Sequence, residues 1–120
     1  NHIENLILGE GLEEIGSYAL SGFGALKTLT LPSTLKKIGS NAFNNCKSLN
    51  ALRLGKNITE IGGHAFRNAS TLEQVSIPDT VTDIRSYAFY YCTNLQSITL
   101  PENITSIGQY AFYYTIYQKV

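Results

Sequence analysis

Residues 26–46 read LKTLTLPSTLKKIGSNAFNNC, and variants of this string follow one another along nearly the whole chain. Its isoleucine sets the period, because isoleucine recurs every 23 residues, at Ile15, Ile38, Ile61, Ile84 and Ile107. A fixed period of this length is typical of a solenoid, in which each repeat buries its apolar face only against its neighbours. We therefore predict a single solenoid domain over residues 1–120, with about five repeats in register.

Composition narrows the possible functions. The chain has 120 residues, enough for one domain, and carries no net charge, with only 15% charged residues. Such a chain has no overall field that would recruit nucleic acid or an anionic membrane. No apolar run approaches the roughly 20 residues that span a bilayer. The chain opens partway through a repeat and contains no methionine, so we expect a fragment of a longer array.

Each repeat contains a short strand. In residues 26–31 the apolar Leu29 and Leu31 alternate with Thr28 and Thr30. A period of two predicts a strand with one face turned inward. Because repeats are related by translation, these strands should run parallel and build one sheet along the solenoid.

The second half of each repeat predicts about one helical turn. Ala42 and Cys46 are four residues apart, with Phe43 beside them, and the serines at Ser17, Ser40 and Ser86 stand where N-caps would. We therefore expect an α/β repeat solenoid, β-dominated, with a parallel sheet on one face and short helical turns on the convex side. Its core spine is predicted to be the column Leu20, Phe43, Phe66, Phe89 and Phe112.

The two cysteines occupy one column, two repeats apart, at Cys46 and Cys92. Strands about 4.8 Å apart would separate their Cα atoms by roughly 10 Å, whereas a disulfide needs less than about 7 Å. Ala69 lies between them in the column, which favours a small buried position over a redox or metal role. We predict no metal site and no cofactor.

The pattern L-x-x-L-x-L-P-x-x-L-x-x-I-G-x-x-A-F-x-x-C of residues 26–46 resembles the BspA-like (Treponema-type) leucine-rich repeat. The AF pair, the proline and the 23-residue length together separate it from other leucine-rich repeats. The resemblance implies parallel strands on a concave or flat face. It also implies a non-enzymatic adhesion module of a bacterial cell-surface or secreted protein, which binds host matrix proteins or other cells. No catalytic residues come with it.

One candidate binding surface is the outward face of the strands. Its side chains are small and mostly hydroxylated, with a single charge: Thr28, Thr30, Arg53, Gln74, Ser76, Ser97 and Thr99. Such a face could bind protein or glycan, although threonine and serine also simply suit an exposed sheet. Useful affinity would need many repeats or multivalent display.

A second candidate surface is aromatic, because seven of the eight tyrosines follow residue 86. Two repeats carry them at equivalent positions: Tyr87, Tyr90 and Tyr91, then Tyr110, Tyr113 and Tyr114. An earlier repeat has Asn41, Asn44 and Asn45 there, so the fold does not require tyrosine. We predict one aromatic patch, which either binds a partner or lies flat and protects the turns.

The ends of the array lack polar caps. The leucine column at 26, 49, 72 and 95 predicts an apolar residue where the chain has Gln118. We therefore expect exposed apolar ends and end-to-end association. No Ser-His-Asp set, paired-carboxylate cleft or phosphate loop appears, so we predict no enzyme. Two functions remain, a protein-binding or adhesion module and a structural spacer or stalk that presents another domain.

Overall fold

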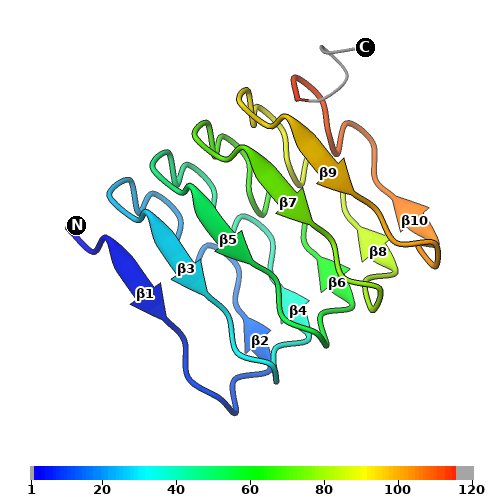
Figure 1. Cartoon of the computed structure of the whole chain (residues 1–120), viewed down its shortest axis with the longest axis horizontal. Coiled ribbons are helices and arrows are strands. Elements are labelled where there is room, and N and C mark those ends of the chain that lie inside the picture. Colours follow the sequence, from blue (N-terminus) through cyan, green and yellow to red (C-terminus); the bar gives the residue numbers. More distant parts are fainter. Residues whose placement is uncertain (1, 116–120) are drawn as a thin grey trace.

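A computed structural model describes residues 2–115, and Gln118 lies outside that range. The chain winds into successive turns stacked along one axis, and each turn contributes two short strands (Figure 1). The first strands of the turns form one row and the second strands form another, so the core lies between two strand faces.

The first row contains the predicted strands, which are β1 (Asn5–Ile7), β3 (Thr28–Thr30), β5 (Ala51–Arg53), β7 (Gln74–Ser76) and β9 (Ser97–Thr99). They pair in parallel with a shift of one repeat, so that Leu6 faces Leu29 and Val75 faces Ile98. This confirms the predicted strands and their register. The row is divided, however, into a sheet β1-β3-β5 and a sheet β7-β9, with no hydrogen-bonded pairing between β5 and β7.

The second row was not predicted from the sequence. Its strands are β2 (Glu14–Ile15), β4 (Lys37–Ile38), β6 (Glu60–Ile61), β8 (Asp83–Ile84) and β10 (Ser106–Ile107). They form one continuous five-stranded parallel sheet. The isoleucine column lies here, and Ile38, Ile61 and Ile84 are almost completely buried. A β-branched residue that always follows an outward polar residue was the sequence signal for this strand.

The predicted helical turns are wrong. Residues 40–45 form consecutive turns, and the part of the chain that the structure describes contains no helix. Asn41 and Asn45 have φ angles of 59° and 64°, which lie outside the right-handed helical region. Ser17, Ser40 and Ser86 therefore cap no helix.

Hydrogen bonding explains why these turns do not continue as a helix. The Ala42 N–H donates locally to the Gly39 carbonyl oxygen at 3.2 Å, but the Phe43 N–H donates to the Ala65 carbonyl oxygen of the next repeat at 2.8 Å. Amides along the turn thus alternate between local and inter-repeat acceptors. Backbone hydrogen bonds therefore join these turns to the next repeat, as they join the strands.

The phenylalanine column forms the predicted spine. Phe43, Phe66 and Phe89 are fully buried, and their rings stack with centroids 5.3 Å and 5.4 Å apart. Phe112 continues the stack at 5.5 Å from Phe89 but is only partly buried, as is Leu20 at the other end. Each phenylalanine therefore packs mainly against the equivalent residue of the next turn.

Three of the glycines that follow the column isoleucines, Gly39, Gly62 and Gly108, permit close stacking of the turns. A Cβ added at Gly39 would lie 2.6 Å from the Ile15 carbonyl oxygen, and one at Gly62 would lie 2.6 Å from that of Ile38. Neither glycine has a positive φ. The absence of a side chain, rather than backbone freedom, is what the fold uses at these positions.

Candidate functional site

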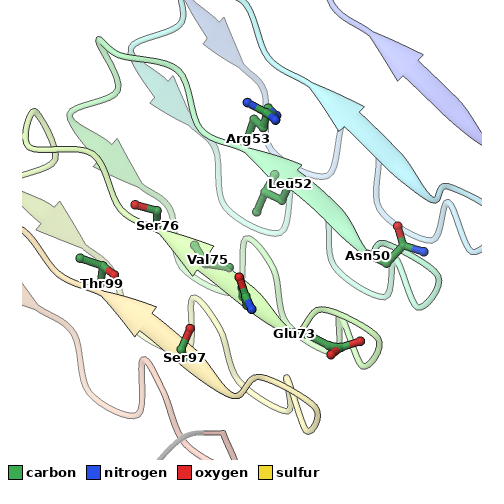
Figure 2. Close-up of a pocket in the computed structure, with 9 residues that line it drawn as sticks. Asn50, Leu52, Arg53, Glu73, Val75, Ser76, Ser97 and Thr99 are labelled. Atoms are coloured by element: carbon green, nitrogen blue, oxygen red, sulfur yellow. The ribbon is translucent and has the colours of Figure 1, made fainter.

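The outward strand face contains a groove where β5 and β7 separate (Figure 2). Its volume is about 620 Å³. It is lined by Asn50, Leu52, Arg53, Glu73, Gln74, Val75, Ser76, Ser97 and Thr99. The structure thus gathers five of the predicted strand-face residues around one groove and leaves Thr28 and Thr30 on β3, away from it.

Only the strand face opens at this junction. The second sheet is continuous from β6 to β8, where Ile61 faces Ile84, and the Phe66–Phe89 stack keeps the same spacing as the Phe43–Phe66 stack. The turns therefore remain packed on the far side of the core. The groove is a wedge between two first-row strands and does not divide the domain.

The polar side chains of the groove are not used by the fold. Within the described range, Arg53 and Glu73 make no ion pair, and Ser76 and Thr99 make no side-chain hydrogen bond. Elsewhere, polar side chains join neighbouring turns, as where Ser33 Oγ donates to Glu10 Oε1 at 2.6 Å. The groove can therefore offer hydrogen bonds and one cation to a polar ligand.

The aromatic candidates lie in the turns that follow β8 and β10. We name as the tyrosine surface the six residues Tyr87, Tyr90, Tyr91, Tyr110, Tyr113 and Tyr114. Equivalent rings meet across the two turns, with centroids 5.3 Å apart for Tyr87 and Tyr110. The Tyr90–Tyr113 and Tyr91–Tyr114 separations are 5.8 Å and 4.7 Å, with ring planes within 7° of parallel. The structure thus brings all six predicted rings into one continuous surface.

Within each repeat, the rings of the tyrosine surface meet at steep angles. Tyr87 and Tyr90 lie 5.0 Å apart at 88°, and Tyr110 and Tyr113 lie 5.1 Å apart at 57°. These four residues line a furrow of about 160 Å³. We call it the tyrosine furrow. It has angled aromatic walls and is not a flat platform.

Two residues that were not predicted as site residues extend this surface toward the N-terminus. His64 stacks on Tyr87 with centroids 4.7 Å apart and planes 5° from parallel. The Arg67 guanidinium carbon lies 5.7 Å from the centroid of the Tyr90 ring, as in a cation–π contact. Both residues occupy the same columns as the tyrosines one repeat later, and this register was the available sequence signal.

The surroundings favour the neutral forms of two residues of this surface, His64 and Tyr90. Burial, and then the nearby charge of Arg67, lower the pKa of His64 from its usual 6.5. Loss of hydration, and then the neighbouring tyrosines Tyr91, Tyr114 and Tyr87, raise the pKa of Tyr90 above its usual 10. The histidine is therefore neutral and the tyrosine protonated at physiological pH, and the Tyr90 hydroxyl is engaged in a hydrogen bond with Tyr91.

Four of the six tyrosines occupy the left-handed region of backbone space. The φ angles are 61°, 60°, 60° and 59° at Tyr87, Tyr91, Tyr110 and Tyr114. The same two columns hold Asn41, Asn45, Asn68 and Gly22, and also Tyr18 and His64, all with positive φ. Asparagine and glycine enter this region readily, whereas a bulky side chain is an outlier there. The backbone therefore favours asparagine or glycine at positions where the sequence has tyrosine.

The two cysteines are buried in the core and are not poised for chemistry. Cys46 and Cys92 are free, buried thiols, and Cys92 Sγ donates to the Phe66 carbonyl oxygen at 3.2 Å. Burial raises the pKa of Cys46 to about 11 and that of Cys92 to about 12. Thiols with such pKa values are poor nucleophiles at neutral pH. Residues 2–115 contain no group of three or more His, Cys, Asp or Glu placed to hold a metal ion.

The two ends of the stack expose apolar side chains. Leu12, at the N-terminal end, is 38% exposed and lines a small cavity with Leu8, Ile15 and Leu20. Ile107, in the last strand, is 46% exposed. Over the described range, no helix is long and apolar enough to cross a membrane.

A parallel stack of turns with a phenylalanine spine and leucine- and isoleucine-lined strands defines a leucine-rich repeat protein. The family model of the BspA-type leucine-rich repeat region matches residues 1–119 in six copies. The chain therefore belongs to the BspA-type leucine-rich repeat family, a family of commonly surface-exposed proteins. No curated sequence matches it significantly.

Solved structures support the same assignment. A leucine-rich repeat protein of T. pallidum is 30% identical, with a TM-score of 0.87 over 90% of this chain and 53% of that one. A leucine-rich cell surface protein of Faecalibacterium prausnitzii is 27% identical, with a TM-score of 0.91 over 96% of this chain and 30% of that one. A Bacteroides ovatus leucine-rich repeat protein is 25% identical, with a TM-score of 0.73 over 93% and 35%. The chain spans about half or less of the length of these proteins.

Proposed function

We propose that the chain is a non-enzymatic protein-binding module of a cell-surface or secreted protein, and that the tyrosine surface is its contact with a partner. The partner class is a host matrix protein or a protein on another cell. Two comparisons support the setting, since leucine-rich repeats are generally non-enzymatic interaction folds and one structural neighbour is described as a cell surface protein.

One observation carries the choice of surface: tyrosine occupies backbone positions that suit asparagine. A left-handed conformation costs an ordinary residue roughly 1–2 kcal/mol. Stacking of an aromatic pair returns about 0.5–1.5 kcal/mol, so the four tyrosines in left-handed positions bring the fold little or no net stability. Four large side chains without a net structural benefit are readily explained by contact with a partner, because tyrosine supplies contact area at low entropic cost.

The chain itself supplies the variant that tests this proposal. Residues 41–45 read NAFNN where residues 87–91 and 110–114 read YAFYY. Replacing both tyrosine segments by NAFNN removes the tyrosine surface and keeps a sequence that already folds in this register. Far-UV circular dichroism and urea unfolding should match those of the unchanged chain.

Binding is then measured on immobilised matrix proteins and on whole cells, with both chains displayed multivalently. We expect the unchanged chain to bind and the NAFNN variant to lose binding. As the matched control for the strand face, Arg53→Thr with Gln74→Ser installs residues found in the same columns, and it should bind normally. Binding lost in this control and kept in the NAFNN variant would move the contact to the β5–β7 groove. No binding by the unchanged chain would favour the spacer or stalk function.

A further inference from the structure

We propose that the tyrosine furrow binds a proline-rich segment in the polyproline II conformation, with an acidic residue of that segment beside Arg67. This inference rests on the proposed function, because it names the kind of partner segment that the tyrosine surface takes. Its basis is the combination of angled aromatic walls, hydroxyl groups and one cation without an acidic partner.

In the first of the two tyrosine turns, the main chain is not free to pair with a ligand strand. The Tyr87 N–H donates to the Gln109 carbonyl oxygen and the Tyr91 N–H donates to the Tyr113 carbonyl oxygen, both at 3.1 Å. These amides are thus used within the solenoid. A ligand that binds as an added strand needs free amides and carbonyls at a sheet edge, so recognition here must depend on side chains.

The shape of the furrow limits the ligand further. Its walls meet at 88° in one repeat and 57° in the next, and its volume is about 160 Å³. An amphipathic helix lays several apolar side chains into a broad groove, for which this furrow is too small. A sugar ring packs against a flat, exposed aromatic face. The rings of Tyr90 and Tyr113 lie parallel and face each other, so the furrow does not favour a sugar.

A polyproline II segment fits the chemistry that remains. Its pyrrolidine rings are apolar and pack into aromatic-lined grooves, and its conformation is formed before binding. Its backbone has no internal hydrogen bonds, so the carbonyl oxygens are free to accept. Tyr110, which lines the furrow and is 45% exposed, offers a hydroxyl that can donate to such a carbonyl. Successive prolines can therefore pack along the furrow, against its aromatic walls, while a tyrosine hydroxyl binds a carbonyl of the segment.

Charge at one end of the furrow specifies a flanking residue. Arg67 lies over the Tyr90 ring and makes no ion pair with any described residue. The neighbouring His64 has a lowered pKa and is neutral at physiological pH. A carboxylate of the ligand would therefore meet one unpaired guanidinium, which binds carboxylates well. The preferred segment is proline-rich with an aspartate or glutamate toward the Arg67 end.

The test uses the whole chain and synthetic peptides. A proline oligomer of about ten residues, long enough for roughly three polyproline II turns, is titrated with and without a terminal aspartate. A glycine–serine peptide of equal length and cellohexaose serve as comparison ligands. Binding is followed by NMR shifts of the tyrosine rings. We expect both proline peptides to bind and the aspartate peptide to bind more tightly.

Matched variants separate the furrow from the rest of the surface. Tyr90→Asn with Tyr113→Asn should weaken proline binding by about tenfold or more, as for loss of central aromatic contacts. Arg67→Asn should remove only the advantage of the aspartate peptide. Tyr18→Asn changes a residue in the column of Tyr87 but outside the furrow, and binding should be unaffected.

Three outcomes would overturn the inference. Proline binding that persists in the NAFNN variant would place that site elsewhere. Tyrosine-dependent binding of cellohexaose without proline binding would make the furrow a glycan site. If no proline peptide binds while matrix proteins still bind through the tyrosines, this inference fails and the proposed function stands.

Discussion

The rings of Tyr91 and Tyr114 stack with centroids 4.7 Å apart and planes 7° from parallel, while both residues have φ angles of about 60°. The stack stabilises the turns and the left-handed backbone destabilises them. Because these two effects on the stability of the turns oppose each other, the tyrosines can contribute to binding while contributing little to folding. This opposition also predicts how substitutions in the same columns will differ.

Tyr18→Asn should raise stability. Tyr18 has a φ of 62° and is 63% exposed, and it makes no ring stack with a described residue. Relief of the backbone conformation should add up to about 1 kcal/mol, because asparagine tolerates this region. Tyr91→Asn relieves the same backbone conformation but also loses a ring stack, so the stability of this variant should change less. Urea unfolding compares the two, and a destabilised Tyr18→Asn would contradict the assignment of strain.

Phe66→Ala should destabilise the chain by about 3–5 kcal/mol, since it removes a fully buried ring from the middle of the spine. Phe112→Ala is the comparison, because Phe112 is only partly buried and stacks on one described phenylalanine. Its cost should be clearly smaller. Equal costs for both variants, measured by equilibrium unfolding, would mean that the spine is not the centre of the core.

Gly39→Ala should destabilise the fold and Gly16→Ala should not. The two glycines occupy one column, but a Cβ at Gly39 meets the Ile15 carbonyl oxygen at 2.6 Å, whereas a Cβ at Gly16 meets nothing within 4 Å. Crowding of packed backbone typically costs about 1–3 kcal/mol. Thermal unfolding of the two variants measures the difference directly. A cost for Gly16→Ala as large as that for Gly39→Ala would argue against close stacking as the cause.

Acidification should weaken the fold partly through His64. Its pKa in the folded chain lies below its usual 6.5. The unfolded chain therefore takes up this proton first as the pH falls, so the stability contributed by neutral His64 is present above pH 6.5 and is lost through the lower folded pKa. His64→Asn, which copies Asn41, should lose less stability between neutral pH and pH 5. An unchanged pH dependence would exclude His64 as a contributor.

The isolated chain should associate through its ends. Leu12 and Ile107 leave apolar surface exposed at opposite ends of the stack, and apolar surface at a solenoid end favours contact with another copy. Sedimentation velocity should show association that grows with concentration and falls in Leu12→Lys. Ile7→Thr removes a more exposed apolar residue from the outward strand face and should leave association unchanged. Association that responds only to Ile7→Thr would point to the strand face instead.

Much of the fold could be predicted because equivalent positions of successive repeats hold the same type of residue and are buried to the same extent. The column of Phe43, Phe66 and Phe89 and the alternation around Leu29 are local signals that the repeat multiplies. The helical prediction was wrong for a physical reason: positions i, i+3 and i+4 share a face both in a helix and in these turns. The sequence does not reveal that the Phe43 amide bonds to the next repeat and not to its own.

The candidate site was predictable in part. The register placed Tyr87 above Tyr110 and Tyr90 above Tyr113, and the rings meet as that register requires. His64 and Arg67 were missed as part of the surface because their types differ from tyrosine, although their columns do not. The opening between β5 and β7 had no sequence signal, because both strands keep the inward apolar residue of the paired strands, Leu52 in β5 and Val75 in β7.

That opening has a mechanical consequence. Tension along the solenoid axis is carried by the bonds that cross from turn to turn. Between β5 and β7 the first row contributes no strand pairing, so the load there passes to the β6–β8 pair and the turn amides. Extension along the axis should therefore begin at this junction, where fewer bonds between neighbouring turns share the load.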